Sequence, residues 1–192
     1  MSSNAFAQSH SQIEILAPWT QKSIKVSIIN KANLSEDKIS VIKKVIQSDS
    51  FYVENDQLYF EGWSGALQAV GSEKEFEVTV SEKTRGGDIT VELLREADPR
   101  YNGYTIPHYA GNRMTLASIQ IYNSENISEP QLENLVRHEF GHALGFGHAS
   151  ERNFIMYESM GTDPKFITRC ELAGLNALSE GLTFKKVDCS LM

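Results

Sequence analysis

Residues 138–148 read HEFGHALGFGH and hold three of the chain's five histidines. His138 and His142 are four positions apart, which on a helix stacks two imidazoles on one side, one turn apart. Gly145 stands where that helix would have to stop, because glycine readily adopts the left-handed conformation of a sharp turn. His148 returns from beyond that turn. Three neutral imidazoles and one open position are the ligand set of a catalytic zinc, so the stretch predicts a metal centre.

Glu139 lies between the first two histidines but points roughly 100° around the helix, given about 3.6 residues per turn. It can therefore reach a water held by the metal without being a ligand itself. The competing interpretation is a polar patch on a helix surface. A chance match to H-E-x-x-H-x-x-G-x-x-H in a chain of this composition has odds on the order of one in 10⁴ to 10⁵, which favours the metal site.

The residues before the histidines predict the helix that carries them. Ser128 and Gln131 form a capping-box pattern, and Pro130 is acceptable in the first turn, so we expect the helix to start at Glu129. The apolar positions recur every three or four residues and predict a broad buried face. They are Leu132, Leu135, Val136, Phe140, Ala143 and Leu144.

Alternating and helical apolar patterns predict the other elements. A helix is expected at 36–48 with Ser35 as its N-cap, and a last helix after Thr168, whose capping-box partner is Glu171. Residues 59–70 are interrupted by glycines and receive no element. Strands are expected at 24–28, 76–80, 88–94 (a central strand) and 114–122, and the proline in GYTIPHYAGN (103–112) favours an edge strand or an irregular loop.

Composition limits the class of protein. The chain has 192 residues, 41% of them hydrophobic, which suits one domain. A net charge of −7 argues against nucleic-acid binding, and the absence of a long apolar run argues against a membrane span. We expect a monomer in which residues 1–12 are a disordered terminus and residues 13–192 form one catalytic domain, divided into 13–148 and 149–192.

Two features bear on the compartment. Cys170 and Cys189 could pair or both stay free. The segment after Gly181 could run back beside the last helix and bring them together, and a disulfide would fit an exported protein. Ala5-Phe6-Ala7 has the small-x-small form of a signal-peptidase site without the apolar segment of a signal peptide before it, although two alanines in a polar terminus can occur by chance. We expect an extracellular or cell-surface location.

At this point the sequence resembles a known clan. HEFGHALGFGH is similar to the long zinc-binding consensus of metzincin metallopeptidases, and NFIMYE (153–158) resembles their Met-turn. Among metzincins the likeness is to matrixins, because Met156 follows His148 by eight residues and Tyr157 follows directly. GGDITVELL (86–94) is also similar to the matrixin strand in which Ala-Asp-Ile is typical. Two departures are Ala149, where matrixins usually have serine, and the lack of proline after Tyr157.

The resemblance implies an α+β fold. It consists of a twisted mixed sheet of about five strands with two helices in an N-terminal subdomain, and a small C-terminal subdomain with one main helix. It also implies a zinc endopeptidase that hydrolyses peptide bonds with a metal-activated water and Glu139 as general base. Met156 would form an apolar floor beneath the histidines, which is also an ordinary core role. Tyr157 could assist a transition state or line the specificity pocket; its spacing favours the lining role, within a wall formed by residues 157–162.

A protein or peptide substrate would lie extended along the edge strand in residues 104–112. Two other functions remain open: a catalytically silent, zinc-stabilised binding or inhibitor domain of the same fold, and a scaffold in which the motif is accidental. Calcium is a further candidate ligand. Asp88, Asp98 and Asn102 could bind it, but such residues also occur in turns for backbone reasons alone. His108 is the only other histidine after residue 12, so a second histidine-rich zinc site has no evident ligands.

Overall fold

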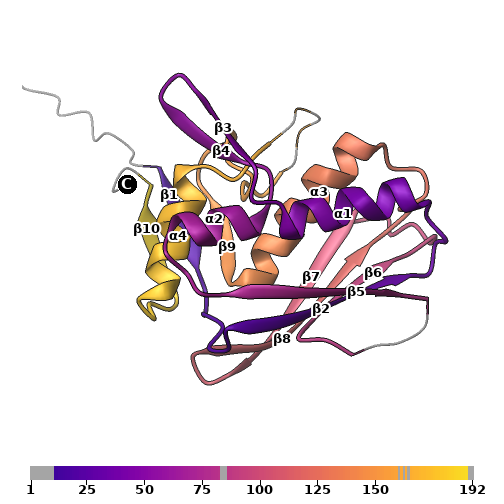
Figure 1. The fold of residues 1–192 in the computed structure, drawn as a ribbon, viewed down its shortest axis with the longest axis horizontal. Helices are drawn as coiled ribbons and strands as arrows, with labels where there is room; N and C mark the ends of the chain where they lie inside the picture. The colour runs from indigo at the N-terminus through magenta and orange to yellow at the C-terminus, as the bar shows by residue number, and fades with distance from the viewer. Residues whose placement is uncertain (1–10, 83–85, 160, 162, 164, 190–192) are drawn as a thin grey trace, which may run out of the picture.

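The computed structural model describes residues 11–82, 86–159, 161, 163 and 165–189. Its main element is a five-stranded mixed sheet in the order β5-β2-β6-β8-β7 (Figure 1). Neighbouring strands are parallel except β7 and β8, which form an antiparallel pair and leave β7 at the edge. The strands are β2 (Ser23–Asn30), β5 (Glu75–Ser81), β6 (Ile89–Leu93), β7 (Gly103–Ala110) and β8 (Arg113–Ile121). The expected α+β fold, central strand and edge strand are confirmed.

Two helices cover one face of this sheet, α1 (Glu36–Gln47) and α3 (Glu129–Leu144), and they pack against each other (Figure 1). The Ser35 side chain accepts a hydrogen bond from the Lys38 backbone N–H and caps α1 as expected. The apolar stripe of α1 is fully buried and meets the inward residues of the strands, so the core lies between the helices and the sheet. Helix α3 is buried in the same core and contacts α1, so the helix that carries His138 and His142 is held firmly against the sheet.

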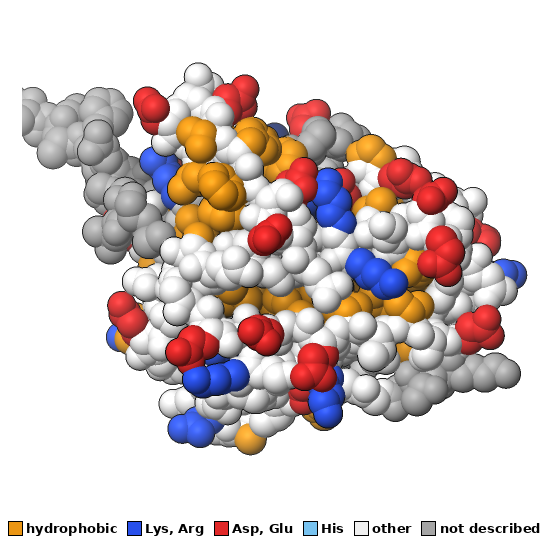
Figure 2. Space-filling view, viewed as in Figure 1, with side chains coloured by type: hydrophobic (Ala, Val, Ile, Leu, Met, Phe, Trp, Pro, Cys, Tyr) orange, Lys and Arg blue, Asp and Glu red, His pale blue; other side chains and the backbone are white. Residues whose placement is uncertain are grey.

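A third helix in this half of the molecule corrects the expected pair. Helix α2 (Trp63–Ala69) occupies the glycine-containing segment that received no element, after a hairpin of β3 (Phe51–Glu54) and β4 (Gln57–Phe60). A Cβ on Gly62 would lie 2.5 Å from the Ser48 carbonyl oxygen. This glycine therefore allows the start of α2 to pack closely against the backbone at the end of α1, and it does not prevent a helix here. Figure 2 shows hydrophobic side chains gathered over the hairpin, where Phe51 and Val53 are exposed.

A second sheet joins the two ends of the described chain. Its order is β10-β1-β9, with β1 (Gln12–Ile15) antiparallel to both β9 (Phe146–Ala149) and β10 (Lys185–Asp188), and it packs against α4 (Arg169–Ser179) (Figure 1). Cys170 on α4 forms a disulfide with Cys189, so the paired alternative is the one observed. Strand β1 begins at Gln12, the last residue of the terminus expected to be disordered. Residues 1–10 of that terminus, with Ala5-Phe6-Ala7, lie outside the described residues.

Among the helices of the described chain, none combines the length and the apolarity needed to cross a bilayer.

Candidate metal centre

Helix α3 begins and ends where the sequence predicts. Ser128 and Gln131 form the capping box, and the helix starts at Glu129. It ends at Gly145, whose φ of 108° is in the left-handed region. A Cβ at this position would overlap the Ala17 carbonyl oxygen, so glycine is required both by the turn and by the chain that passes beside it. The turn sends the chain into β9 and brings His148 back toward the helix.

Backbone carbonyls orient the two helical imidazoles. The Nδ1 of His138 lies 2.7 Å from the Ile155 oxygen, and the Nδ1 of His142 lies 3.0 Å from the Phe146 oxygen. A carbonyl oxygen can only accept, so each Nδ1 carries the proton and each Nε2 keeps a lone pair. Burial, which disfavours the charged ring, lowers the pKa of His138 to about 3 and that of His142 to about 4. Both imidazoles are therefore neutral, as a metal ligand requires.

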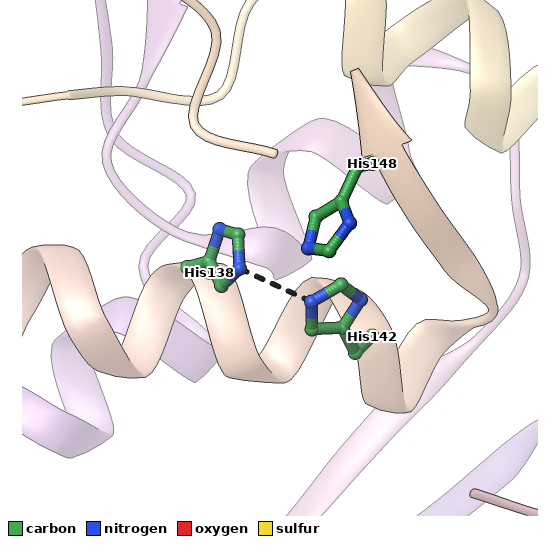
Figure 3. Close-up of side chains that lie close together, drawn as sticks. All are labelled: His138, His142 and His148. Atoms are coloured by element: carbon green, nitrogen blue, oxygen red, sulfur yellow. Dashed lines mark hydrogen bonds between the residues drawn. The ribbon is translucent and has the colours of Figure 1, made fainter. Parts of the chain in front are cut away.

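His148 completes the cluster from β9, and its ring faces the other two (Figure 3). The candidate ligand atoms of the three side chains lie within 4.8 Å of one another. The Nε2 atoms of His138 and His142 are 3.1 Å apart, close to the separation of about 3.3 Å that two nitrogens have on one tetrahedral zinc with Zn–N bonds of about 2.0–2.1 Å. Two facing lone pairs repel unless a cation lies between them. The donor set therefore fits zinc.

The carboxylate of Glu139 is held beside the histidines by strand β7. The Thr105 hydroxyl lies 2.6 Å from Glu139 Oε2 and donates to it. Two residues earlier on the same face of β7, a Cβ on Gly103 would lie 2.9 Å from Glu139 Oε1, so glycine leaves space for the carboxylate. Burial raises the pKa of Glu139 to about 7, against the opposing effect of the Thr105 hydrogen bond. Such a carboxyl group can both take up and release a proton near neutral pH.

Met156 is fully buried and packs against helix α3 at Gly141, and its expected role as a floor beneath the histidines stays a prediction. A Cβ on Gly141, in the turn between His138 and His142, would overlap Met156 Sδ. Gly141 therefore allows the methionine to pack directly against the helix backbone. Ile155, the residue before Met156, supplies the carbonyl that orients His138, so this turn fixes one of the imidazoles of the site.

A cleft with a volume of about 450 Å³ opens over the histidines and Glu139. Edge strand β7 forms one of its walls, and the residues of β1 and β9 form another. Glu158 lines the cleft from the segment after the Met-turn. Tyr157 is half-buried, and Lys165 Nζ lies 5.8 Å from its ring centroid. Its expected place in a substrate pocket stays a prediction, as does the rest of the wall, because residues 160 and 162 lie outside the described chain.

Two of the three candidate calcium ligands accept hydrogen bonds from the backbone. The Asp88 carboxylate accepts the Lys25 backbone N–H at 2.8 Å, and the Asp98 carboxylate accepts that of Arg100 at 2.8 Å. Both contacts are ordinary turn or strand-end hydrogen bonds. Among the described residues, His138, His142 and His148 are the one group of three or more His, Cys, Asp or Glu side chains whose ligand atoms converge. Calcium binding through Asp88, Asp98 and Asn102 stays a prediction.

Sequence reasoning missed the residues that position this site from a distance. Thr105 lies outside the two motifs, and although Phe146 and Ile155 lie within them, nothing in the sequence marks their carbonyls as partners of the imidazoles. Buried Arg137 is a further example, since its guanidinium donates to the carbonyl oxygens of Glu61 and Lys165 and fixes the segment after the Met-turn against α3. The one signal in the sequence that could have indicated Thr105 is the alternation of side chains in the edge strand, which places residues 103 and 105 on the same face.

The family model described as Matrixin matches residues 18–176, which includes α3, the three histidines and the Met-turn. No curated protein gives a significant match. The match covers most of the chain and agrees with the histidine cluster and the mixed sheet. This protein therefore belongs to the matrixin family of zinc metallopeptidases.

Proposed function

We propose that this protein is a zinc-dependent endopeptidase with Glu139 as its general base. One observation carries the proposal: three imidazoles with converging ring nitrogens and the Glu139 carboxylate line the same cleft. A structural zinc site would close its fourth position with a protein ligand, and the described residues bring no fourth ligand to this cluster. That leaves a position that a substrate or water can take.

His138, His142 and His148 would hold the metal, and their carbonyl partners fix two of the rings. When bound, zinc supplies Lewis acidity that lowers the pKa of water and polarises a peptide carbonyl. Glu139 accepts a proton from the attacking water at a carboxylate oxygen and passes it to the leaving amine nitrogen. Thr105 donates to Oε2 throughout and keeps the carboxylate oriented. Water thus adds to the carbonyl carbon, the C–N bond breaks, and the amine leaves with the proton.

The substrate is a peptide or protein segment in extended form, bound along β7. Two features support this: β7 is an edge strand, and its residues 103–105 and Pro107 line the cleft. An edge strand offers unpaired backbone groups to an added strand. Tyr157 and the residues after it form the wall on the leaving side and select the side chain that follows the cut bond.

The three histidines and Glu139 come from one chain, so a monomer holds a complete site. The disulfide between Cys170 and Cys189 supports an extracellular or cell-surface location, because such bonds persist in oxidising compartments.

The test is cleavage of a denatured-proteome peptide mixture, with and without a chelator, with cut sites mapped by mass spectrometry. Glu139→Gln should retain zinc, measured by elemental analysis, and lose cleavage. The matched control is Glu129→Gln, which removes the same charge from the first turn of the same helix and should leave cleavage unchanged. Equal turnover by Glu139→Gln would refute the mechanism. A chain that binds zinc and cuts no peptide would instead be the silent binding domain.

A further inference from the structure

The third metal ligand is held differently from the first two. His138 and His142 lie on a 16-residue helix and each has a backbone carbonyl on Nδ1. His148 is exposed, lies on a strand of four residues, and has no hydrogen-bond partner for its ring among the described residues. The position of its ring in Figure 3 therefore depends on where the backbone of β9 lies.

Strand β1 determines the place of β9. Ile13 pairs with Ala149, and Ile15 pairs with Phe146. Two more hydrogen bonds flank these pairs: the Leu16 N–H donates to the Gly145 oxygen at 2.7 Å, and the Ser150 N–H donates to the Gln12 oxygen at 2.8 Å. The contact is close enough that a Cβ on Gly147 would lie 2.7 Å from Glu14 Cβ. On its other edge β9 has only a short contact, the Ala149 N–H bonded to the Met156 oxygen at 2.8 Å.

Strand β1 is in turn held by β10 and the disulfide. Ile13 pairs with Val187 on its second edge, and the Cys189 N–H donates to the Ser11 oxygen at 2.9 Å. Cys189 is bonded to Cys170 on α4, and both are buried. The disulfide therefore fixes β10 to the same helix on which the sheet packs. A continuous series of contacts runs from this bond through β10, β1 and β9 to His148.

We propose that β1 is the positioning element for His148 and that the Cys170–Cys189 disulfide, by fixing β10 to α4, keeps β1 in place and so sets the metal affinity of the site. The proposal rests on the zinc site and not on peptide hydrolysis. Weakening this series of contacts should lower metal affinity while His138 and Glu139, which have no hydrogen-bond partner on β9, stay where they are. Outer groups that orient a ligand typically change metal affinity 10- to 100-fold.

The first experiment measures the zinc Kd of Cys170→Ala/Cys189→Ala by competition with a fluorescent chelator, and the visible spectrum of the cobalt-substituted protein. The Kd should rise about tenfold, and the intensity of the four-coordinate cobalt bands should fall. Val91→Ala is the matched control. Val91 is fully buried on the central strand of the other sheet, so this substitution lowers global stability without changing a contact of β1. A Kd within twofold of the unaltered protein, or an equal rise in Val91→Ala, overturns the proposal.

The second experiment needs no variant, so it tests the coupling between β1 and the metal site even if the cysteine variant does not fold. If docking of β1 favours metal binding, metal binding must favour docking of β1 by the same factor. Hydrogen exchange of the Leu16 and Ser150 amides should therefore slow about tenfold when zinc is added to the metal-free protein. The control is the Glu61 amide, bonded to the Ser50 oxygen at the base of the exposed hairpin. Equal exchange of Leu16 and Ser150 with and without zinc refutes the coupling.

Discussion

The contact between Gly141 and Met156 can be tested with a double-mutant cycle. In Gly141→Ala the new Cβ would overlap Met156 Sδ and would lie 3.0 Å from both Met156 Cε and Trp63 Cζ2. Trp63 and Met156 are fully buried, so neither side chain can move into solvent. The added methyl group must push the methionine away from its place against α3.

Two opposing terms set the magnitude. Alanine is favoured over glycine inside a helix by about 1 kcal/mol. Overpacking a filled core costs about 1–3 kcal/mol. The free energy of unfolding should therefore fall by roughly 0–2 kcal/mol in Gly141→Ala. In a Met156→Ala background, which itself costs about 2–5 kcal/mol, the overlapping atom is gone and the same substitution should stabilise by up to about 1 kcal/mol.

The assay is denaturant unfolding of all four proteins with zinc removed, so that metal affinity does not enter the free energies. The substitution at Gly141 should change sign between the two backgrounds, with a coupling energy of about 1–3 kcal/mol. The same effect in both backgrounds would show that Met156 does not limit the space at Gly141. In that case close packing against Met156 would not be the reason for glycine at position 141.

Three further predictions concern the metal, the general base and a buried carboxyl group. Chelation should lower the thermal midpoint, by the equivalent of about 4 kcal/mol when free zinc is a thousandfold above its Kd, whereas His148→Ala should melt at nearly the same temperature with and without chelator. Thr105→Val removes the donor to Glu139 Oε2 and should reduce kcat/KM roughly tenfold or more while zinc content stays unchanged; parallel loss of zinc would instead indicate a structural role. Burial raises the pKa of Glu171 above its ordinary value of 4.5, so its favourable contribution to stability is complete below pH 4.5 and is lost as the pH rises through the folded-state pKa. As the pH rises, the unaltered protein should therefore lose stability relative to Glu171→Gln, as measured from denaturant midpoints at several pH values. A stability difference that is constant with pH would contradict this.

The sequence predicted the elements whose signals are local. Helices α1, α3 and α4 have a capping residue and a buried stripe, and the strands of the large sheet alternate because only one face of each meets the helices. The motif predicted the metal ligands for the same reason, since His138 and His142 share one helix and Gly145 marks its end.

The missed elements depend on contacts that are distant in sequence. Helix α2 has no side-chain cap, and its Gly62 is needed for contact with Ser48, which a single sequence presents only as a helix-breaking residue. Strands β1, β9 and β10 have four residues each, too few for a clear period, and form only when paired. Thr105 was missed because its partner is 34 positions away.

The pairing of β1 with β10 also orders the events of folding. Strand β1 is among the first described residues, yet one of its two neighbours, β10, lies at the far end of the described chain. Contacts so far apart in sequence form late, because the intervening chain must first be arranged. During synthesis the helix with His138 and His142 is available well before β10 has been made. The third ligand therefore gains its full support only after β10 has been made, which delays a tight metal site until the rest of the domain has folded.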